Sequence, residues 1–282
     1  MYPSNFDYQR AASVADAIQK GSGDGAKFLA GGHSLLPALK LRLNEPESLV
    51  DIGRLDALKG ISVSGSSVKI GALSTHAQIA TSADVKKHAP ALASACGQVG
   101  DPAVRNRGTL GGNLAHADPA SDPPTVVLAL GGKLHLQGSG GNRVVAAEDF
   151  FLDLFTTDLH PGELITAVEI PSIGQAKSAY AKMAHPASRY AVVGVCVVLE
   201  VSGGKCSKAR VAVGGATPKA TLSAAATNAL VGSSLDAAAL DAAAKALSAD
   251  LSDVMGDVYA PEDYRRAMAG VYLKRAVRAA LG

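Results

Sequence analysis

Two glycine pairs in similar settings constrain this chain more than any other feature. The first lies in Ala30-Gly31-Gly32-His33-Ser34 and the second in Thr109-Leu110-Gly111-Gly112-Asn113. Glycine has no Cβ, so it accepts a positive φ and lets an anionic group come close to the backbone. Consecutive backbone N–H groups in such a turn form a concave site for phosphate. Two such loops predict a site for the two phosphates of one dinucleotide, although a Gly-Gly pair by itself is more often a simple turn.

The length and charge of the chain exclude several classes of protein. Its 282 residues suffice for one large domain or two ordinary ones, and 48% of them are hydrophobic. The net charge is only +2 and there is no long basic stripe, so nucleic-acid binding has no support. No apolar run approaches the ~20 residues of a membrane helix, and the N-terminal residues do not resemble a signal peptide. We therefore do not expect an integral membrane protein.

The cysteines do not form a metal-binding motif. Cys96, Cys196 and Cys206 are far apart in the sequence, and the spacings of zinc sites and iron–sulfur clusters are missing. The histidines do not have metal-ligand spacing on any one element, so we predict that the chain holds no metal. Isolated cysteines are typically buried in proteins of a reducing compartment. We expect a cytoplasmic location, the inner face of the membrane included.

The pattern of apolar residues predicts two domains with a boundary near residues 172–177. The first domain, 1–174, is expected to divide into subdomains at about 1–56 and 57–174. The second domain, 177–282, begins with three strand-like runs at 178–183, 190–201 and 209–214, which predict an antiparallel sheet, and it ends in a predicted helix at 262–281. The chain has neither a G-x-G-x-x-G motif nor alternating βαβ units, so a Rossmann site is not expected.

Several motifs together resemble those of a known family. They are Leu29 to Pro37, Asp101 to Asn113, Asp118 to Asp122, Pro161 to Ile165 and Tyr264 to Ala269. In this order and spacing they resemble the medium, FAD-binding subunits of molybdenum hydroxylases, most closely those of the aerobic carbon monoxide dehydrogenase type. The resemblance covers essentially the whole chain. The two glycine motifs are specific for the family and much less specific for one member of it.

The resemblance implies an α+β fold. The first domain would have the FAD-binding fold of the p-cresol-methylhydroxylase type, with two α/β subdomains that hold a non-covalent FAD between them. The second domain would contain a three-stranded antiparallel sheet and helices.

The resemblance also implies a place in an oxidoreductase complex. Its partners would be a small subunit with two [2Fe–2S] clusters and a large subunit with molybdenum–cytosine dinucleotide, in a dimer of heterotrimers. The FAD would take electrons from the clusters and pass them to an external acceptor, quinone or oxygen. The substrate would be oxidised on another chain, so no catalytic residue is expected here.

The candidate phosphate-binding residues are those of the two glycine motifs. We expect the backbone N–H groups of Ala30, Gly31, Gly32, His33, Ser34 and Leu35, and of Thr109, Leu110, Gly111, Gly112 and Asn113, to bind the pyrophosphate. The hydroxyls of Ser34 and Thr109 would assist. His33 would bind a phosphate or simply occupy the turn.

A second group of candidates would contact the sugar and the flavin ring. Asp118 belongs to this group, and Asp122 would accept from ribose or ribityl hydroxyls unless it caps the following helix. The resemblance places Leu159 against the isoalloxazine ring. Lys182 would stabilise the reduced flavin, or be a solvated charge on a strand. Tyr190 would cover a face of the ring, or pack within the sheet.

Other functions remain open from the sequence. The same subunit could serve an aldehyde, purine or N-heterocycle hydroxylase. A stand-alone flavoenzyme of the same fold would need an acid or base near the flavin, which the sequence does not reveal. A non-catalytic nucleotide-binding or assembly subunit would not need both glycine motifs.

Overall fold

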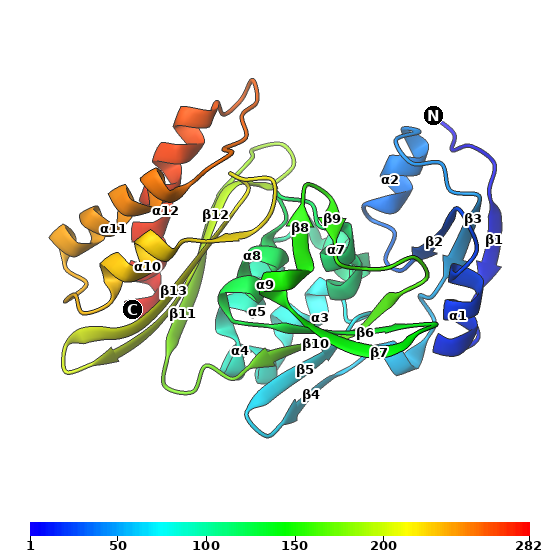
Figure 1. The fold of residues 1–282 in the computed structure, drawn as a ribbon, viewed down its shortest axis with the longest axis horizontal. Coiled ribbons are helices and arrows are strands. Elements are labelled where there is room, and N and C mark those ends of the chain that lie inside the picture. Colours follow the sequence, from blue (N-terminus) through cyan, green and yellow to red (C-terminus); the bar gives the residue numbers. More distant parts are fainter.

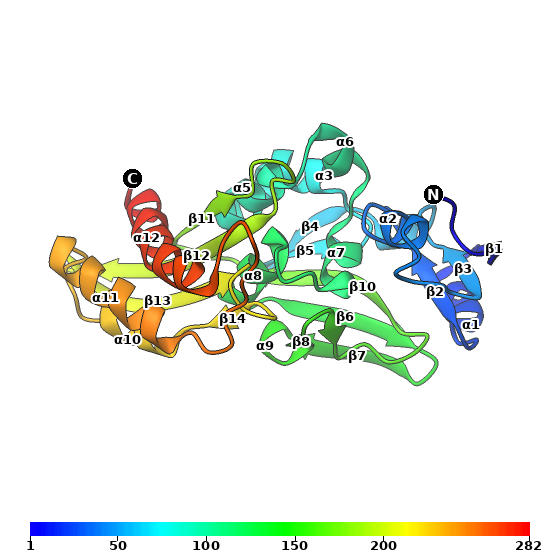
Figure 2. The ribbon, with the colours of Figure 1, turned by 90° about the horizontal axis from the view of Figure 1, so that it is seen from above.

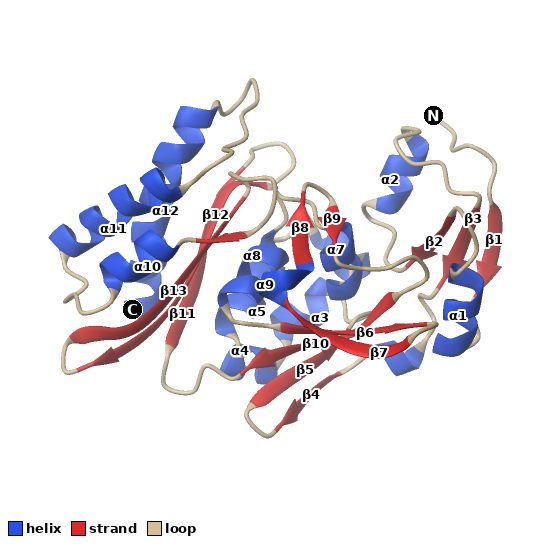
Figure 3. Cartoon of the chain, in the orientation of Figure 1, coloured by secondary structure: helices blue, strands red, loops and turns tan.

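The computed structural model describes residues 1–282, and the three larger of its four β-sheets follow one another along its long axis (Figure 1). A small parallel sheet near the N-terminus is followed by a central antiparallel sheet and then by a C-terminal antiparallel sheet. Helices lie against each sheet (Figure 3). The mixture of segregated helices and largely antiparallel strands confirms the predicted α+β class.

The N-terminal subdomain is a three-stranded parallel sheet with two short helices. The strands are β1 (Asp7–Arg10), β2 (Ala26–Leu29) and β3 (Ser48–Asp51), in the order β1-β3-β2. Helix α1 (Val14–Gly21) connects β1 to β2, and α2 (Leu35–Lys40) connects β2 to β3. The hydroxyl of Ser13 caps α1 by accepting from the N–H of Asp16. The first glycine motif therefore lies where β2 ends and α2 begins.

The second subdomain is built on a five-stranded antiparallel sheet in the order β4-β5-β10-β6-β7. These strands are β4 (Ile61–Ser64), β5 (Ser67–Gly71), β6 (Lys133–Gly138), β7 (Gly141–Ala146) and β10 (Leu164–Pro171). Buried side chains of β5, β6 and β10 form the largest core together with the helices between β5 and β6. Two antiparallel hairpins, β4–β5 and β6–β7, form the two edges of this sheet.

Short elements connect the strands of this subdomain. The 3₁₀ helix η1 (Asp56–Leu58) precedes β4, and the helices between β5 and β6 are α3 (His76–Thr81), α4 (Ala83–His88), α5 (Pro90–Gln98), α6 (Pro102–Arg107), α7 (Leu110–His116) and α8 (Asp122–Ala129). Between β7 and β10 lie α9 (Ala147–Phe150), β8 (Phe151–Asp153) and β9 (Thr156–Thr157). The second glycine motif thus belongs to the first turn of a helix, α7, rather than to a loop.

The antiparallel sheet of the C-terminal domain lies between helices of its own domain and helices of the first domain. Its strands follow chain order: β11 (Lys177–Ala184), β12 (Ala191–Ser202), β13 (Lys205–Gly214) and β14 (Thr221–Leu222). Helices α10 (Ala224–Leu230), α11 (Ala237–Asp250) and α12 (Glu262–Leu281) cover the outer face, as Figure 2 shows from above. The inner face packs on α5 and α8. Strand β12 is buried on both faces of the sheet, which explains its continuous apolar run.

The prediction of a three-stranded sheet was incomplete here. The fourth strand, β14, has only two residues and pairs with Ala212 and Val213 of β13. A strand this short has no alternation of apolar and polar residues by which the sequence could reveal it.

Candidate functional site

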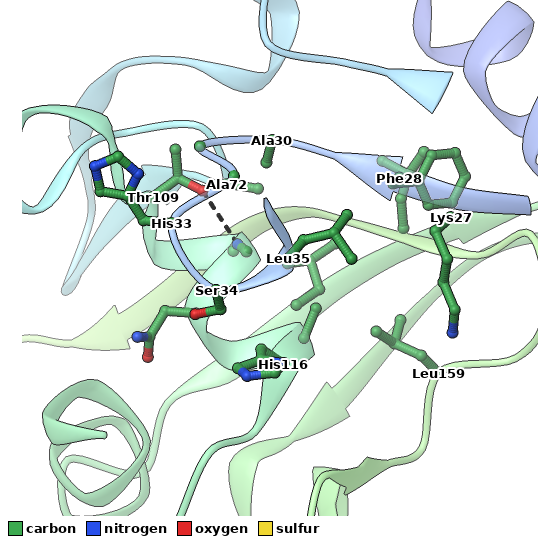
Figure 4. Close-up of a pocket in the computed structure, with 18 of the residues that line it drawn as sticks. Lys27, Phe28, Ala30, His33, Ser34, Leu35, Ala72, Thr109, His116 and Leu159 are labelled. Carbon is green, nitrogen blue, oxygen red and sulfur yellow. Dashed lines mark hydrogen bonds between the residues drawn. The ribbon is translucent and has the colours of Figure 1, made fainter. Parts of the chain in front are cut away.

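A cleft of about 860 Å³ opens between the two subdomains of the first domain and reaches the edge of the C-terminal domain. Both glycine motifs line it, together with the end of α1, the loop after β9 and the segment Ser188 to Tyr190. Figure 4 shows the first motif around Ser34 beside α7, which carries His116. The cleft is therefore built from segments that are far apart in the sequence.

Only glycine fits at Gly31 because the backbone just before the second motif packs against it. A Cβ at Gly31 would lie 2.1 Å from the carbonyl oxygen of Arg107 and 3.0 Å from the Cα of Gly108. The next residue, Gly32, has φ +76°, a conformation that L side chains rarely adopt. The first motif needs its two glycines for two different reasons, a close approach and a left-handed backbone.

The second motif begins helix α7. The hydroxyl of Thr109 accepts from the N–H of Gly112 at 3.2 Å and caps the helix. Gly111 faces the core, where a Cβ would lie 2.5 Å from the Cβ of Ala72. A Cβ at Gly112 would lie 3.5 Å from the Cβ of Ala30, on the side of the first motif. The N–H groups of Leu110 and Gly111 already donate to the carbonyl oxygens of Ser74 and Ala72, so this turn offers an anion the positive end of the helix dipole rather than free donors.

The segment that follows α7 turns back toward the cleft. Ala117 ends the helix in a left-handed conformation, and the hydroxyl of Ser121 donates to Oδ1 of Asn113 at 2.8 Å. Oδ1 of Asp118 accepts from the N–H of Ala120 at 2.9 Å, which fixes the turn. Burial raises the pKa of Asp118. Asn113 and Ser121 line the cleft, whereas Asp118 stands behind them.

Asp122 is buried at the start of α8, and its carboxylate makes two close contacts from the C-terminal domain. Oδ1 accepts from the hydroxyl of Tyr180 at 2.6 Å, and Oδ2 accepts from the ammonium of Lys182 at 2.8 Å. Burial raises the pKa of Asp122, and the charge of Lys182 opposes this effect. Ser121, not Asp122, occupies the N-cap position of α8, so the capping interpretation was wrong.

Lys182 is enclosed by protein. Its side chain is 2% exposed, and its ammonium also donates to the carbonyl oxygens of Gln98 and Arg189. The interpretation as a solvated strand charge was therefore wrong. Lys182 itself does not line the cleft. Arg189, whose carbonyl oxygen it contacts, does line the cleft, and so do Val99, next to Gln98, and Tyr190.

Tyr190 and Leu159 both reach the cleft. Tyr190 is 42% exposed and follows Arg189, whose φ is +61°. Tyr190 lies in the loop before β12, so the interpretation as packing within the sheet was wrong. Leu159 lies below Lys27 and Phe28 of β2 in Figure 4.

Some lining residues were not among the sequence candidates. They include Phe28, His76, Val99, Phe155, Glu163 and Arg189. They lie in strand β2, at the start of helix α3 and in loops, and no shared sequence pattern marks them, so only the fold brings them together. One predicted residue, Leu110, points the other way and is fully buried in the core.

The described residues contain no cluster of three or more histidine, cysteine or carboxylate side chains that could hold a metal ion. None of the helices combines the length and the apolar character needed to span a membrane.

Comparison with known families accounts for nearly the whole chain. The FAD binding domain in molybdopterin dehydrogenase matches residues 4–173, and the CO dehydrogenase flavoprotein C-terminal domain matches residues 178–280. The chain belongs to the FAD-binding medium subunits of molybdenum hydroxylases. The resemblance noted in the sequence is thereby confirmed, and so is FAD as the cofactor of this family.

Relatives of this family match over most or nearly all of the chain. The carbon monoxide dehydrogenase medium chain of Afipia carboxidovorans is 40% identical over 99% of this chain and 98% of its own. The glyceraldehyde dehydrogenase medium chain of Sulfolobus acidocaldarius is 40% identical over 78% of each chain. A solved structure of Cu,Mo-CO dehydrogenase superposes with a TM-score of 0.95, at 38% identity and 99% coverage of both chains.

The residues present fit a dinucleotide in the cleft of this FAD-binding subunit. Gly31 lets the backbone of Arg107 and Gly108 pack directly on the first motif, and Gly31, Gly32 and Gly112 all line the cleft without a side chain that would narrow it. The volume of about 860 Å³ lies within the range of cofactor pockets.

Proposed function

We propose that this chain is the electron-transfer subunit of a molybdenum hydroxylase complex that oxidises carbon monoxide. The observation that carries the proposal is the cleft, which two glycine motifs line from opposite subdomains. The similarity to carbon monoxide dehydrogenase medium chains over almost the whole length supports the substrate. This chain contributes an oxidoreductase function without oxidising the substrate itself.

The backbone of the two motifs would hold the pyrophosphate of FAD. In the first motif the N–H groups of residues 31–35 would face it, with His33 and the hydroxyl of Ser34 beside them. The second motif would contribute the positive end of the α7 dipole, because the N–H groups of residues 110–113 already donate to acceptors within the protein, contrary to the expectation from the sequence. When bound, FAD accepts and releases electrons, which is the chemistry that the chain itself lacks.

Side chains along the cleft would orient the rest of the cofactor. Asn113 and Asp122 would bond its hydroxyl groups, Asp122 while it remains paired with Lys182. Leu159 and Tyr190 would contact its flat, apolar parts. Asp118 and Lys182 would act from behind the wall by fixing the segments that form it.

The partners follow from what this chain lacks. Its three cysteines are buried singly in the folded chain, so the iron–sulfur clusters of the complex would lie on a small partner subunit. The molybdenum–cytosine dinucleotide would lie on a large subunit, in a dimer of heterotrimers, and the external acceptor would be quinone or oxygen. Free, buried thiols suit a reducing compartment, so we place the complex in the cytoplasm or at the inner face of the membrane.

The visible spectrum of the purified native complex tests this function. We expect flavin absorbance near one FAD per medium chain, released into the supernatant on heating, and iron–sulfur absorbance from the partner. The same preparation should reduce a dye with carbon monoxide. A colourless chain that cannot be reconstituted with FAD would indicate an assembly role, and flavin that precipitates with the protein would indicate a covalent, stand-alone flavoenzyme.

A second substrate class has specific support. The 40% identity to a glyceraldehyde dehydrogenase medium chain equals that to the carbon monoxide dehydrogenase chain, over a shorter length. The dye assay is therefore repeated with glyceraldehyde, a purine and an N-heterocycle. Dye reduction by one of these and not by carbon monoxide would keep the electron-transfer role and replace the substrate.

A further inference from the structure

One wall of the cleft is a tight turn between β9 and β10. Leu159, His160, Pro161 and Gly162 line the cleft there. The N–H of Glu163 donates to the carbonyl oxygen of His160 at 3.0 Å, and Gly162 has φ +74°. Proline followed by a glycine of positive φ is typical of a type II turn. The backbone of the turn thus fixes its shape locally but not its place in the cleft.

The turn packs closely against the N-terminal subdomain. A Cβ at Gly162 would lie 3.0 Å from the Cα of Ser22 and 3.3 Å from the carbonyl oxygen of Gly21, at the end of α1. The turn therefore bridges the seam in which the cleft lies, and a shift of the turn would change the width of the cleft.

A single guanidinium holds both ends of this turn. Arg143, on β7, donates through Nε and Nη2 to the two carboxylate oxygens of Glu163, at 2.7 and 2.6 Å. It also donates to the carboxylate and to the carbonyl oxygen of Asp158. Glu163 in turn accepts from the N–H of His160 at 3.0 Å, and its side chain is 7% exposed. Bidentate pairing of this kind fixes direction as well as distance.

Arg143 itself is not part of the cleft lining, so any effect on a ligand must pass through the turn. We propose that Arg143, with Glu163, is a positioning residue for cofactor binding: it sets Leu159 and the Pro161-Gly162 turn against α1 before FAD enters. This inference rests on the proposed function, because it takes the cleft as the FAD site. Because this wall of the cleft is already ordered, FAD binding does not lose the free energy that ordering it would cost.

The test is FAD affinity of the full-length chain, freed of flavin and titrated while flavin fluorescence is followed. The variants are Arg143→Lys and Glu163→Gln. Arg143→Lys keeps the positive charge but cannot pair with a carboxylate through two parallel hydrogen bonds. We expect FAD binding to weaken about tenfold in each, with much less than a hundredfold loss in the double variant, because the two side chains act as one unit. Arg210→Lys is the matched control. Arg210 bonds the carbonyl oxygens of Leu128 and Ala129 and the carboxylate of Glu148, away from the cleft.

Thermal unfolding with and without FAD separates positioning from mere stability. A purely structural Arg143 would lower the melting temperature of both forms equally and leave the dissociation constant unchanged, which would overturn the inference. We expect instead that the rise in melting temperature caused by FAD shrinks in Arg143→Lys and stays the same in Arg210→Lys. If Arg143→Lys does not fold, Asp158→Asn decides by the same two measurements, because Asp158 is the other carboxylate partner of Arg143 and, unlike Glu163, does not line the cleft. Wild-type chain that does not bind FAD would overturn the proposed function itself, a different result from variants that bind as well as wild type.

Discussion

The ammonium of Lys182 lies 2.8 Å from Oδ2 of Asp122, and their side chains are only 2% and 4% exposed. The pair joins the first residue of α8 to strand β11 and thus connects the FAD-binding domain to the C-terminal domain. The three donors of the ammonium find three acceptors, since the carbonyl oxygens of Gln98 and Arg189 complete the set. A buried charge pair that is fully satisfied in this way tolerates the loss of neither partner.

Replacing Lys182 with methionine should therefore destabilise the protein strongly. The carboxylate of Asp122 would stay buried without its counter-charge, which typically costs about 3–5 kcal/mol. The measurement is the free energy of unfolding in urea of wild type, of Lys182→Met and of a control variant. The control, Lys208→Met, removes the exposed pair with Glu200 on the neighbouring strands and should cost no more than about 1 kcal/mol. Equal losses in the two variants would contradict the buried-pair interpretation.

The same pair shows why part of the site was hidden in the sequence. Asp122 and Lys182 are 60 residues apart, and no local pattern predicts that they meet. The helix α7 was missed for a different reason. Two adjacent glycines lower the helix propensity of this segment. In the folded chain the helix forms nevertheless, because Thr109 caps it and Gly111 packs closely on Ala72.

The parts that could be predicted depend on short-range signals. The hairpins are marked by alternation of apolar and polar residues around a turn, and strand β12 by its apolar run. The glycine motifs were recognisable because each glycine has a backbone reason to be there, as at Gly31 and Gly32. The family resemblance supplied the rest of the architecture, which such local patterns leave undetermined.

Gly31→Ala should impair flavin binding more than folding. The new methyl group would collide with the backbone of Arg107, which cannot move aside as a side chain could, so the first motif would move away from the segment that leads into the second. We expect a stability loss of about 1–3 kcal/mol and a lower flavin content in the purified chain. Gly140→Ala is the control, because nothing lies within 4 Å of its added Cβ. Full flavin occupancy in Gly31→Ala would argue against close contact of the motifs at the cofactor.

The three thiols should be inert in the native protein. Cys96 and Cys196 are fully buried, and burial raises the pKa of both thiols far above neutral pH. Because the thiolate is the reactive form, we expect no labelling by iodoacetamide at neutral pH until the chain is unfolded. Replacement of all three cysteines by alanine should leave the flavin spectrum unchanged, and a lost or shifted spectrum in a folded variant would reveal a role beyond packing.

Acid should destabilise the protein through His76. This side chain is 2% exposed beneath Gly108, its Nδ1 has no partner, and burial lowers its pKa from 6.5 to about 4. Above pH 6.5 the imidazole is neutral in the folded and in the unfolded chain. As the pH falls from 6.5 toward 4, only the unfolded chain takes up the proton, so the free energy of unfolding decreases.

The size of this effect follows from the shift in pKa. It amounts to about 3 kcal/mol once the pH has fallen below 4, where the folded chain takes up the proton as well. Because carboxylates titrate in the same range, the measurement is the difference in unfolding free energy between wild type and His76→Gln across pH 4 to 7. We expect this difference to change with pH in the direction that favours wild type at pH 7. A difference that is independent of pH would mean that His76 is solvated or paired in the folded protein.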